Sequence, residues 1–373
     1  MSMLELDKVS KVYRSGTFGA GFKPALRQVS FGIDRGEVVS LIGESGSGKS
    51  TLGKIVLRLT PSSGGRVSFE GEDVTPKKGR ALHDYYKYVQ GVFQDPFSSY
   101  NPLYKADRVF EMIRQEYFAG MAKGTWEAKV DAVLETVALN PEDVLNKFPH
   151  QLSGGQQQRL LVARALLLDV KLLIADEIIS MLDASTRVDV LNMLVSLKRQ
   201  GLGILFITHD LSLGNYISDK TVILRHGAIV EMGETAKVFG NAQHQYTKSL
   251  LTAVPQLHKK WAPFELTAKG SGLAAQNGSG AKAASGLAAA KRYSKGVLSP
   301  LRHGEPARAV LAPTGTALGG EVLPGPRPSL MEMEGERWQR RGRRRQSLEE
   351  VLAESAPPPL VECEPGHLVA VEN

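Results

Sequence analysis

One short stretch near the N-terminus combines glycines, a lysine and hydroxyl side chains in the order that phosphate binding requires. Small residues let successive backbone N–H groups turn inward around a phosphate chain. Lys49 would add a positive charge for the β- and γ-phosphates, and Ser50 would add an oxygen ligand for Mg²⁺. The pattern G-x-x-x-x-G-K-[ST] therefore predicts a P-loop that binds a nucleoside triphosphate. Its residues are Gly43, Glu44, Ser45, Gly46, Ser47, Gly48, Lys49, Ser50 and Thr51.

The residues on either side of this loop predict the strand and the helix that must position it. Residues 37–42 form an apolar run that leads into the loop, and the segment after Thr51 carries apolar residues at helical spacing as far as Pro61. A strand before the loop and a helix after it place free N–H groups and the positive end of the helix dipole at the phosphates.

Length, composition and charge limit the class of protein. The chain has 373 residues, of which 42% are hydrophobic and 23% charged, and this suits one large globular domain or two smaller ones. Cys363 is the only cysteine, which excludes a disulfide within the chain and a cysteine metal cluster. We expect neither a secretory signal nor a membrane span. The net charge of +7 lies largely near the C-terminus and indicates little about the nucleotide site.

The remaining pattern alternates between strands and helices, which is typical of a parallel sheet covered on both faces. Residues 104–145 predict an inserted helical subdomain. Residues 185–198 predict a helix with Val188, Leu191 and Leu194 facing inward. Strands are predicted at 4–12, 25–33, 37–42, 66–70, 89–93, 172–176 and 204–207, with a closing hairpin at 221–233.

The composition changes after about residue 258. Residues 268–328 are rich in Ala, Gly, Ser and Pro with little periodicity, which predicts a mobile linker. For the arginine run at 340–345, a solvated face is favoured over attraction to anionic headgroups. Ser347 and Glu350 then have the spacing of a capping box at the start of a helix.

Further polar residues follow the predicted strands and helices, and each motif is weak by itself. They are Gln94, the run Ser153, Gly154, Gly155 and Gln156, the pair Asp176 and Glu177, then Asp183 and His209. Together with the P-loop, their order and approximate spacing resemble ABC-type ATPases. The serine-glycine-glycine-glutamine signature is far more specific than a P-loop alone.

Two stretches narrow the resemblance to ATPases of the oligopeptide/dipeptide import type. Residues 92–102 resemble the Q-loop of that family, and residues 243–251 resemble a segment near the end of its ATPase domain. The likeness covers about residues 3–255 and returns faintly at 362–367. The chain departs from the family at Gln245, usually proline, and it lacks the cysteine cluster that many relatives carry after the ATPase domain. It also departs in the loop before Asp183, at Ile178, Ile179 and Met181.

Roles for the polar residues follow from phosphoryl-transfer chemistry together with the resemblance. Ser50 and Asp176 are expected to hold Mg²⁺, Asp176 directly or through water. Gln94 is expected to have a catalytic role, in contact with Mg²⁺ or with the attacking water. Glu177 is expected to polarise the attacking water, and His209 to contact the γ-phosphate. The weaker alternatives are a solvated strand end for the acidic pair and a structural role for His209.

The remaining expected contacts are with the base and with the second nucleotide. Tyr13 is expected to stack on adenine, with simple packing as the alternative. In the family, the signature Ser153, Gly154, Gly155 and Gln156 faces the P-loop of the other protomer, so these residues and Asp183 are expected to contact that nucleotide.

The resemblance implies an ATP-hydrolysing subunit that uses ATP and Mg²⁺ to power import of peptides or similar small solutes through dimer closure. Many relatives pair with a distinct, similar ATPase, so a heterodimer is expected and a homodimer is the alternative. The other implied partners are two membrane-spanning permease subunits and an extracytoplasmic solute-binding protein, without nucleic acid. The implied location is the cytoplasmic face of the membrane. The solute cannot be inferred, because the other subunits select it.

The sequence disfavours two other functions. A soluble ABC-type ATPase acting on ribosomes or DNA is disfavoured, since the chain has one P-loop, one signature and no sustained heptads. A nucleotide-binding regulator without turnover is disfavoured by Glu177.

The expected fold is therefore α/β: a P-loop NTPase domain of ABC type with an inserted helical subdomain and a small antiparallel β part, plus a largely irregular C-terminal extension. The ATPase domain is expected at 1–256, with its helical subdomain at about 95–168. A linker at 257–328 and the extension at 329–373 follow.

Overall fold

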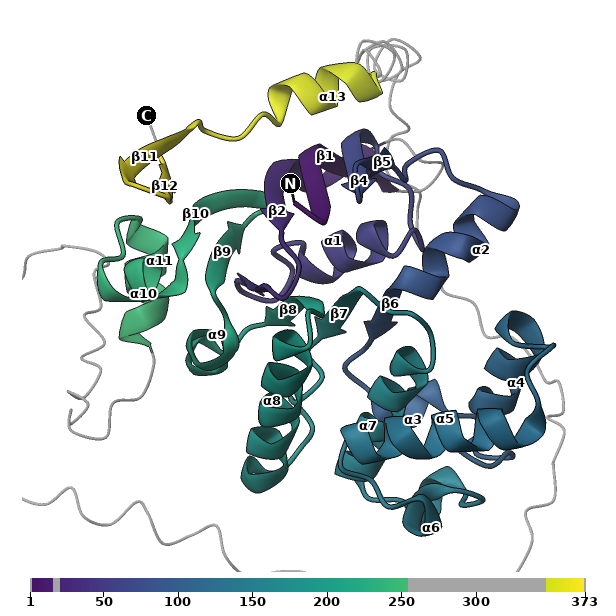
Figure 1. Ribbon diagram of the computed structural model, residues 1–373. Helices are drawn as coiled ribbons and strands as arrows, with labels where there is room; N and C mark the ends of the chain where they lie inside the picture. The colour runs from purple at the N-terminus through teal and green to yellow at the C-terminus, as the bar shows by residue number, and fades with distance from the viewer. Residues whose placement is uncertain (1, 16–20, 254–346, 372–373) are drawn as a thin grey trace, which may run out of the picture. The chain divides into compact units, whose positions relative to one another are not determined.

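The computed structural model describes residues 2–15, 21–253 and 347–371 (Figure 1). Residues 1–259 and 344–373 belong to one compact unit. The predicted linker at 257–328 and the arginine run at 340–345 lie outside the described residues. The domain boundaries proposed from composition remain predictions.

The main sheet has a parallel centre, as the apolar runs predicted. Within the described residues its strand order is β11-β12-β10-β9-β3-β8-β7-β6, where β11 is Leu360–Glu364 and β12 is His367–Ala370. The pairs β9–β3, β3–β8, β8–β7 and β7–β6 are parallel, while β10 and the C-terminal strands are antiparallel. The central members are β3 (Val38–Ile42), β6 (Val89–Val92), β7 (Leu172–Asp176), β8 (Gly203–Thr208), β9 (Lys220–Arg225) and β10 (Ala228–Glu234). Every residue of β3, β7 and β8 is buried, which explains their continuous apolar sequence.

A second, antiparallel sheet provides the small β part and has the order β2-β1-β4-β5. Its strands are β1 (Leu4–Ser15), β2 (Gly21–Ile33), β4 (Gly64–Phe69) and β5 (Glu72–Asp73). Helix α1 (Lys49–Val56) lies between the two sheets (Figure 1). Its Leu52 and Ile55 share one apolar core with Leu4 of β1 and Leu205 of β8. The helix that follows the P-loop is therefore clamped from both sides.

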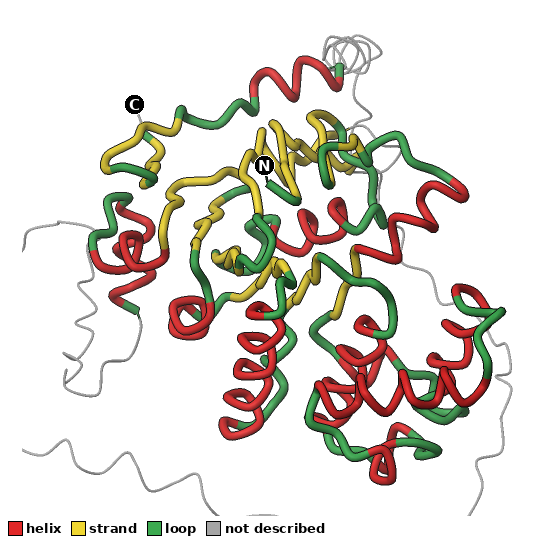
Figure 2. Tube along the Cα trace, viewed as in Figure 1, coloured by secondary structure: helices red, strands yellow, loops and turns green. Residues whose placement is uncertain are grey.

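The helices of the inserted subdomain lie together beside β6 and β7 (Figure 2). They are α3 (Pro96–Ser99), α4 (Arg108–Tyr117), α5 (Lys123–Thr136), α6 (Pro141–Val144), the 3₁₀ turn η2 (Pro149–Gln151) and α7 (Gly154–Leu166). Trp126, Leu134 and Leu160 anchor a core that also includes residues of α8 (Ala184–Arg199). The predicted helical subdomain is confirmed, whereas α2 (Gly79–Tyr88) was not predicted.

The closing helices and the C-terminal segment complete the described chain. Helices α9 (Leu211–Ile217), α10 (Thr235–Gly240) and α11 (Gln245–Thr252) follow β8 and β10. The C-terminal segment, residues 347–371, forms α13 (Leu348–Glu354), β11 (Leu360–Glu364) and β12 (His367–Ala370). The Ser347 hydroxyl accepts the Glu350 N–H, and the Glu350 carboxylate accepts the Ser347 N–H, so the predicted capping box is confirmed. The end of the extension is thus ordered, because β12 joins the main sheet on β10.

One side-chain direction was wrong. Val188 was predicted to face inward, but it is 50% exposed. Val190 and Met193 are buried instead, together with Leu191 and Leu194. Since successive helical residues are about 100° apart, this set turns the buried stripe of α8 away from Val188.

Helix α8 therefore offers a matched pair of substitutions. Leu194 is fully buried, so Leu194→Ala is expected to lower the free energy of unfolding by about 2–5 kcal/mol through lost contacts and a cavity. Val188→Ala on the exposed side is expected to change it by about 0.5 kcal/mol or less. Urea titration of both variants measures the two values, and equal losses would contradict this assignment of the core.

Candidate functional site

The P-loop forms a tight turn that leads into the N-terminus of α1. Gly46 and Gly48 have φ angles of 83° and 110°, which side chains rarely adopt. A Cβ at Gly48 would clash with the Ala25 carbonyl, whereas a Cβ at Gly46 would meet nothing within 4 Å. Gly48 is thus required by the close approach of β2, and the loop at Gly46 faces open space.

The backbone donors at this helix start are available for an anion. Gly48 is the N-cap of α1, and no side chain caps the first turn. The first N–H groups of a helix lack intrahelical acceptors, and they carry the positive end of the helix dipole. Ser47 Oγ is also buried without a hydrogen-bond partner among the described residues. Phosphate oxygens are the ligands that satisfy such a set of donors.

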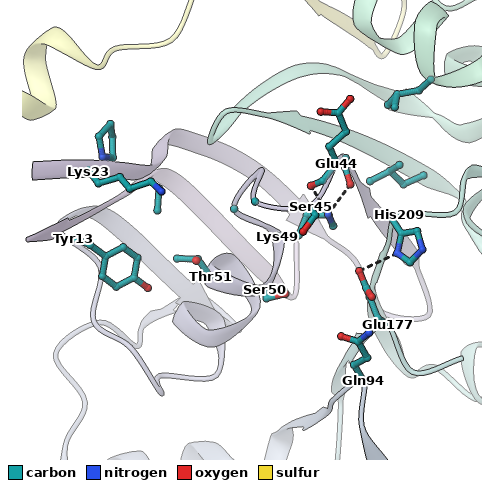
Figure 3. Close-up of a pocket in the computed structure, with 17 residues that line it drawn as sticks. Tyr13, Lys23, Glu44, Ser45, Lys49, Ser50, Thr51, Gln94, Glu177 and His209 are labelled. Carbon is teal, nitrogen blue, oxygen red and sulfur yellow. Dashed lines mark hydrogen bonds and ion pairs between the residues drawn. The ribbon is translucent and has the colours of Figure 1, made fainter. Parts of the chain in front are cut away.

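The side chain of Lys49 points back toward the first residues of the P-loop (Figure 3). Its Nζ donates to the carbonyl oxygens of Gly43 at 2.6 Å and Glu44 at 2.9 Å. Burial lowers the pKa of Lys49, and the nearby carboxylates of Glu177 and Asp176 oppose that shift. The ammonium is therefore held by weak backbone acceptors that an anionic phosphate can replace.

Asp176 is the last residue of β7, and its side chain interacts with Ser50 in the first turn of α1. Burial raises its pKa, and the charge of Glu177 raises it further, while a hydrogen bond from Ser50 opposes the shift. Its Oδ1 is buried without a hydrogen-bond partner among the described residues. A carboxylate and a hydroxyl in contact, with one oxygen left unsatisfied, fit a hard cation such as Mg²⁺.

Glu177 and His209 meet at the ends of neighbouring strands. Glu177 has a φ of 52°, and its N–H donates to the Ile207 carbonyl at 2.9 Å. This turn directs the side chain toward His209, whose Nδ1 lies 3.0 Å from Glu177 Oε1 (Figure 3). Gln94, just after β6, faces the same space. In a parallel sheet the carboxyl ends of strands share one edge, so the chain brings these three residues together.

A single cavity of about 840 Å³ joins these groups, and its size is ordinary for a ligand-binding pocket. Of the predicted residues, Ser47 and Asp176 lie beneath the surface rather than along it. The predicted residues that line the cavity are Tyr13, Gly43, Glu44, Ser45, Gly46, Gly48, Lys49, Ser50, Thr51, Gln94, Glu177 and His209.

Several residues at this site were not among the predicted site residues. Lys23 lines the cavity beside Tyr13, which is its cross-strand partner in the β1–β2 pair. Leu250 lines it from α11, and the Tyr246 hydroxyl accepts the Glu44 N–H at 3.1 Å. Tyr246 and Leu250 lie in the stretch 243–251 that resembled the family, whereas nothing in the local sequence indicated Lys23.

The signature residues form a second surface. Ser153 Oγ accepts the Gln156 N–H at 3.2 Å, and Gln156 Oε1 accepts the Ser153 N–H at 2.9 Å, so the two residues form a capping box at the start of α7. A Cβ at Gly155 would clash with Thr186 of α8. Asp183 caps α8 by accepting the Thr186 N–H at 2.9 Å. None of Ser153, Gly154, Gly155, Gln156 or Asp183 lines the cavity of this chain.

The unusual residues of the loop before Asp183 have distinct environments. Ile178 and Ile179 are 1% and 2% exposed and belong to the core shared with the helical subdomain. Met181 is 57% exposed. Arg187 donates to the Leu182 carbonyl at 2.8 Å and so holds the loop against α8. The two isoleucine side chains therefore anchor the loop in this core and do not line the cavity.

Comparison with known proteins places this geometry among transport ATPases. Residues 26–180 match the ABC transporter family, and residues 230–281 match the C-terminal region of oligopeptide/dipeptide transporters. The chain is 40% identical over 273 residues to the oligopeptide transport ATP-binding protein OppF of Streptococcus mutans, covering 70% of this chain and 88% of that protein. It is 43% identical over 238 residues to OppF of Bacillus subtilis, covering 63% and 77%.

Two further matches each cover 62% of this chain. The glutathione import ATP-binding protein GsiA of Shigella flexneri is 43% identical over 237 residues, which cover 62% of this chain and 37% of that protein. A dimeric ATP-binding cassette solved in a post-hydrolysis state with ADP and phosphate has a TM-score of 0.56 at 28% identity, covering 62% of this chain and 99% of that chain. No helix in the described part of this chain is long and apolar enough to cross a bilayer.

The raised pKa of Asp176 gives opposite predictions for stability and activity. Asp176→Asn is expected to raise the unfolding temperature of the nucleotide-free chain at neutral pH, because the fold disfavours the charged carboxylate. The gain should shrink as the pH falls from the folded-state pKa toward the ordinary value of 3.8, where the wild-type carboxyl is also neutral. Hydrolysis of ATP should drop about 100-fold or more because a carboxylate of the proposed Mg²⁺ site is lost.

Calorimetry across pH measures the stability, and a phosphate-release assay measures the hydrolysis. An Asn variant that is less stable than the wild type would contradict the inferred cost of burying the charged carboxylate.

Proposed function

Because the chain belongs to the ATP-binding subunits of ABC transporters of the oligopeptide/dipeptide type, we propose that it hydrolyses MgATP at the cavity around Lys49. The observation that carries the proposal is Glu177, which enters this cavity from the end of β7 and contacts His209. Hydrolysis would power the import of peptides or similar small solutes. OppF and GsiA, named for oligopeptide transport and glutathione import, support this substrate class.

The chain's own groups provide the binding contacts. Tyr13, which is 40% exposed at the cavity, stacks on adenine. The P-loop N–H groups and Lys49 hold the phosphate chain. Ser50, Asp176 and Gln94 hold Mg²⁺, which supplies charge neutralisation on the phosphates when bound.

Glu177 acts on the attacking water. Its carboxylate accepts a proton as the water oxygen bonds to the γ-phosphorus, and the bond from that phosphorus to the bridging oxygen of ADP breaks. His209 donates from Nδ1 to the Glu177 carboxylate and so orients it. A contact from Nε2–H to the γ-phosphate would require the ring to carry both protons. The products are ADP and inorganic phosphate.

The signature of one chain completes the site of another. Ser153 Oγ, the Gly154 and Gly155 N–H groups and the start of α7 form a second anion site that the cavity of the same chain does not reach. ATP held between the two surfaces favours a closed dimer, and hydrolysis releases it. We propose a heterodimer with a similar ATPase, docked on two permease subunits at the cytoplasmic face of the membrane and served by an extracytoplasmic solute-binding protein. The alternative of a ribosome- or DNA-directed ATPase finds no support in the matched relatives.

Glu177→Gln tests the proposed base. The amide preserves the shape of the side chain but accepts no proton, so ATP binding should remain while the turnover rate falls by about 100-fold or more. Single-turnover hydrolysis and ATP binding, both measured with the partner present, separate the two effects. Asp189→Asn on the surface of α8 is the control. Near-normal turnover in Glu177→Gln would move the base elsewhere.

Ser153→Arg tests the shared site. A bulky cation in the signature should block hydrolysis at the P-loop of the partner chain while the partner still binds nucleotide. Asn140→Arg is the matched control, because Asn140 is also an exposed N-cap in the helical subdomain. Radiolabelled ATP with a partner-specific P-loop variant reports which site turns over. Full hydrolysis at the partner's P-loop would exclude the exchange of signatures.

A further inference from the structure

A buried hydrogen bond between two side chains joins the C-terminal segment to the main sheet. His367 Nε2 lies 2.8 Å from Glu231 Oε1, and both side chains are 0% exposed. Glu231 lies on β10 and His367 opens β12, the strand that pairs with β10. These residues are 136 positions apart, and the catalytic chemistry proposed above uses neither.

Glu231 is a junction of three donors. Besides His367, its carboxylate accepts the Gln243 N–H at 2.8 Å and the His244 N–H at 3.1 Å. The Nδ1 atom of His367 is buried without a hydrogen-bond partner among the described residues, which fits a neutral imidazole with its proton on Nε2. Three N–H donors around one ionised carboxylate make strong, charge-assisted bonds. Loss of the imidazole would leave a buried charge short of one donor.

The junction continues to the nucleotide cavity through α11. His244 is the N-cap of that helix and accepts the Tyr246 N–H at 3.0 Å. Tyr246 is buried, and its hydroxyl accepts the N–H of Glu44 in the P-loop at 3.1 Å. Leu250, one turn later, lines the cavity. The carboxylate that His367 supports therefore fixes the helix that holds one P-loop amide.

The C-terminal segment also contacts the opposite wall of the cavity. Arg27 of β2 donates to the carbonyl oxygens of Ser355 at 2.7 Å and Ala356 at 3.2 Å. Lys23 and Ala25, shortly before Arg27 on the same strand, line the cavity. Residues 347–371 are thus attached to β2 on one side and, through Glu231, to the start of α11 on the other.

We propose that His367 is a positioning residue for nucleotide binding, acting through Glu231, His244 and Tyr246 on the Glu44 amide of the P-loop. The inference rests on the ATP site proposed above and adds a route by which the far C-terminus sets its affinity. Removal of the Nε2 donor relaxes the start of α11, and Tyr246 then loses its place at Glu44. The loop must recover that order when phosphate binds, so affinity falls.

A double-mutant cycle on the full-length chain tests this route. His367→Leu and Tyr246→Phe are each expected to weaken ADP binding about 5-fold or more, measured by titration calorimetry. The double variant should bind ADP no more weakly than whichever single variant binds it less tightly, because both substitutions interrupt the same series of contacts. His367→Gln, whose amide N–H can replace Nε2–H, should restore most of the affinity.

Lys237→Met is the matched control. It removes a surface bond from Lys237 to the Pro365 carbonyl on the same hairpin and leaves Glu231 untouched, so ADP affinity should not change. Should His367→Leu fail to fold, Glu231→Gln takes its place in the cycle. Unchanged ADP affinity in a folded variant, or losses that multiply in the double variant, would overturn the proposal. Failure of the wild-type chain to bind ADP would instead overturn the proposed function.

Discussion

The burial of α1 between two sheets is the constraint on which the nucleotide site depends. Leu52 and Ile55 pack against both sheets, so the uncapped start of the helix is fixed beneath the P-loop. A helix start with converging N–H groups and no side-chain cap favours the binding of an anion. The same core fixes β7 and β8 next to α1, and these strands carry Asp176 and lead to Glu177 and His209. Rigid packing therefore supplies the preorganisation that phosphoryl transfer requires.

The second constraint is the separation of the signature from the cavity. The start of α7 is capped by Ser153 and lies close to Thr186 of α8 at Gly155, and neither Ser153 nor Gly155 lines the cavity of this chain. In the proposed dimer, a phosphate held between the two surfaces would bridge two chains. Binding energy would then be converted into closure of an interface, and the proposed permease subunits would use that movement.

Much of the site could be predicted because its residues follow locally recognisable strands and turns. Lys49, Asp176 and His209 each come at the end of a strand or loop whose pattern is legible in the sequence. Lys23 was missed because its position depends on pairing with β1. The bond between Tyr246 and Glu44 spans 202 residues, and the pair His367–Glu231 spans 136. Such contacts depend on tertiary packing, which the local sequence pattern does not predict. The inward prediction for Val188 failed for a related reason, since neighbouring elements decide which side of an amphipathic helix is covered.

The central claim is that ATP is hydrolysed between two chains, with the P-loop of one and the signature of the other. The specific ATPase activity of the purified chain, measured against total protein concentration with and without a partner ATPase, tests it most directly. A composite site predicts that activity per chain rises with concentration, saturates, and reaches its maximum with the partner. Full activity in a monomer, constant at all concentrations and indifferent to any partner, would contradict the account.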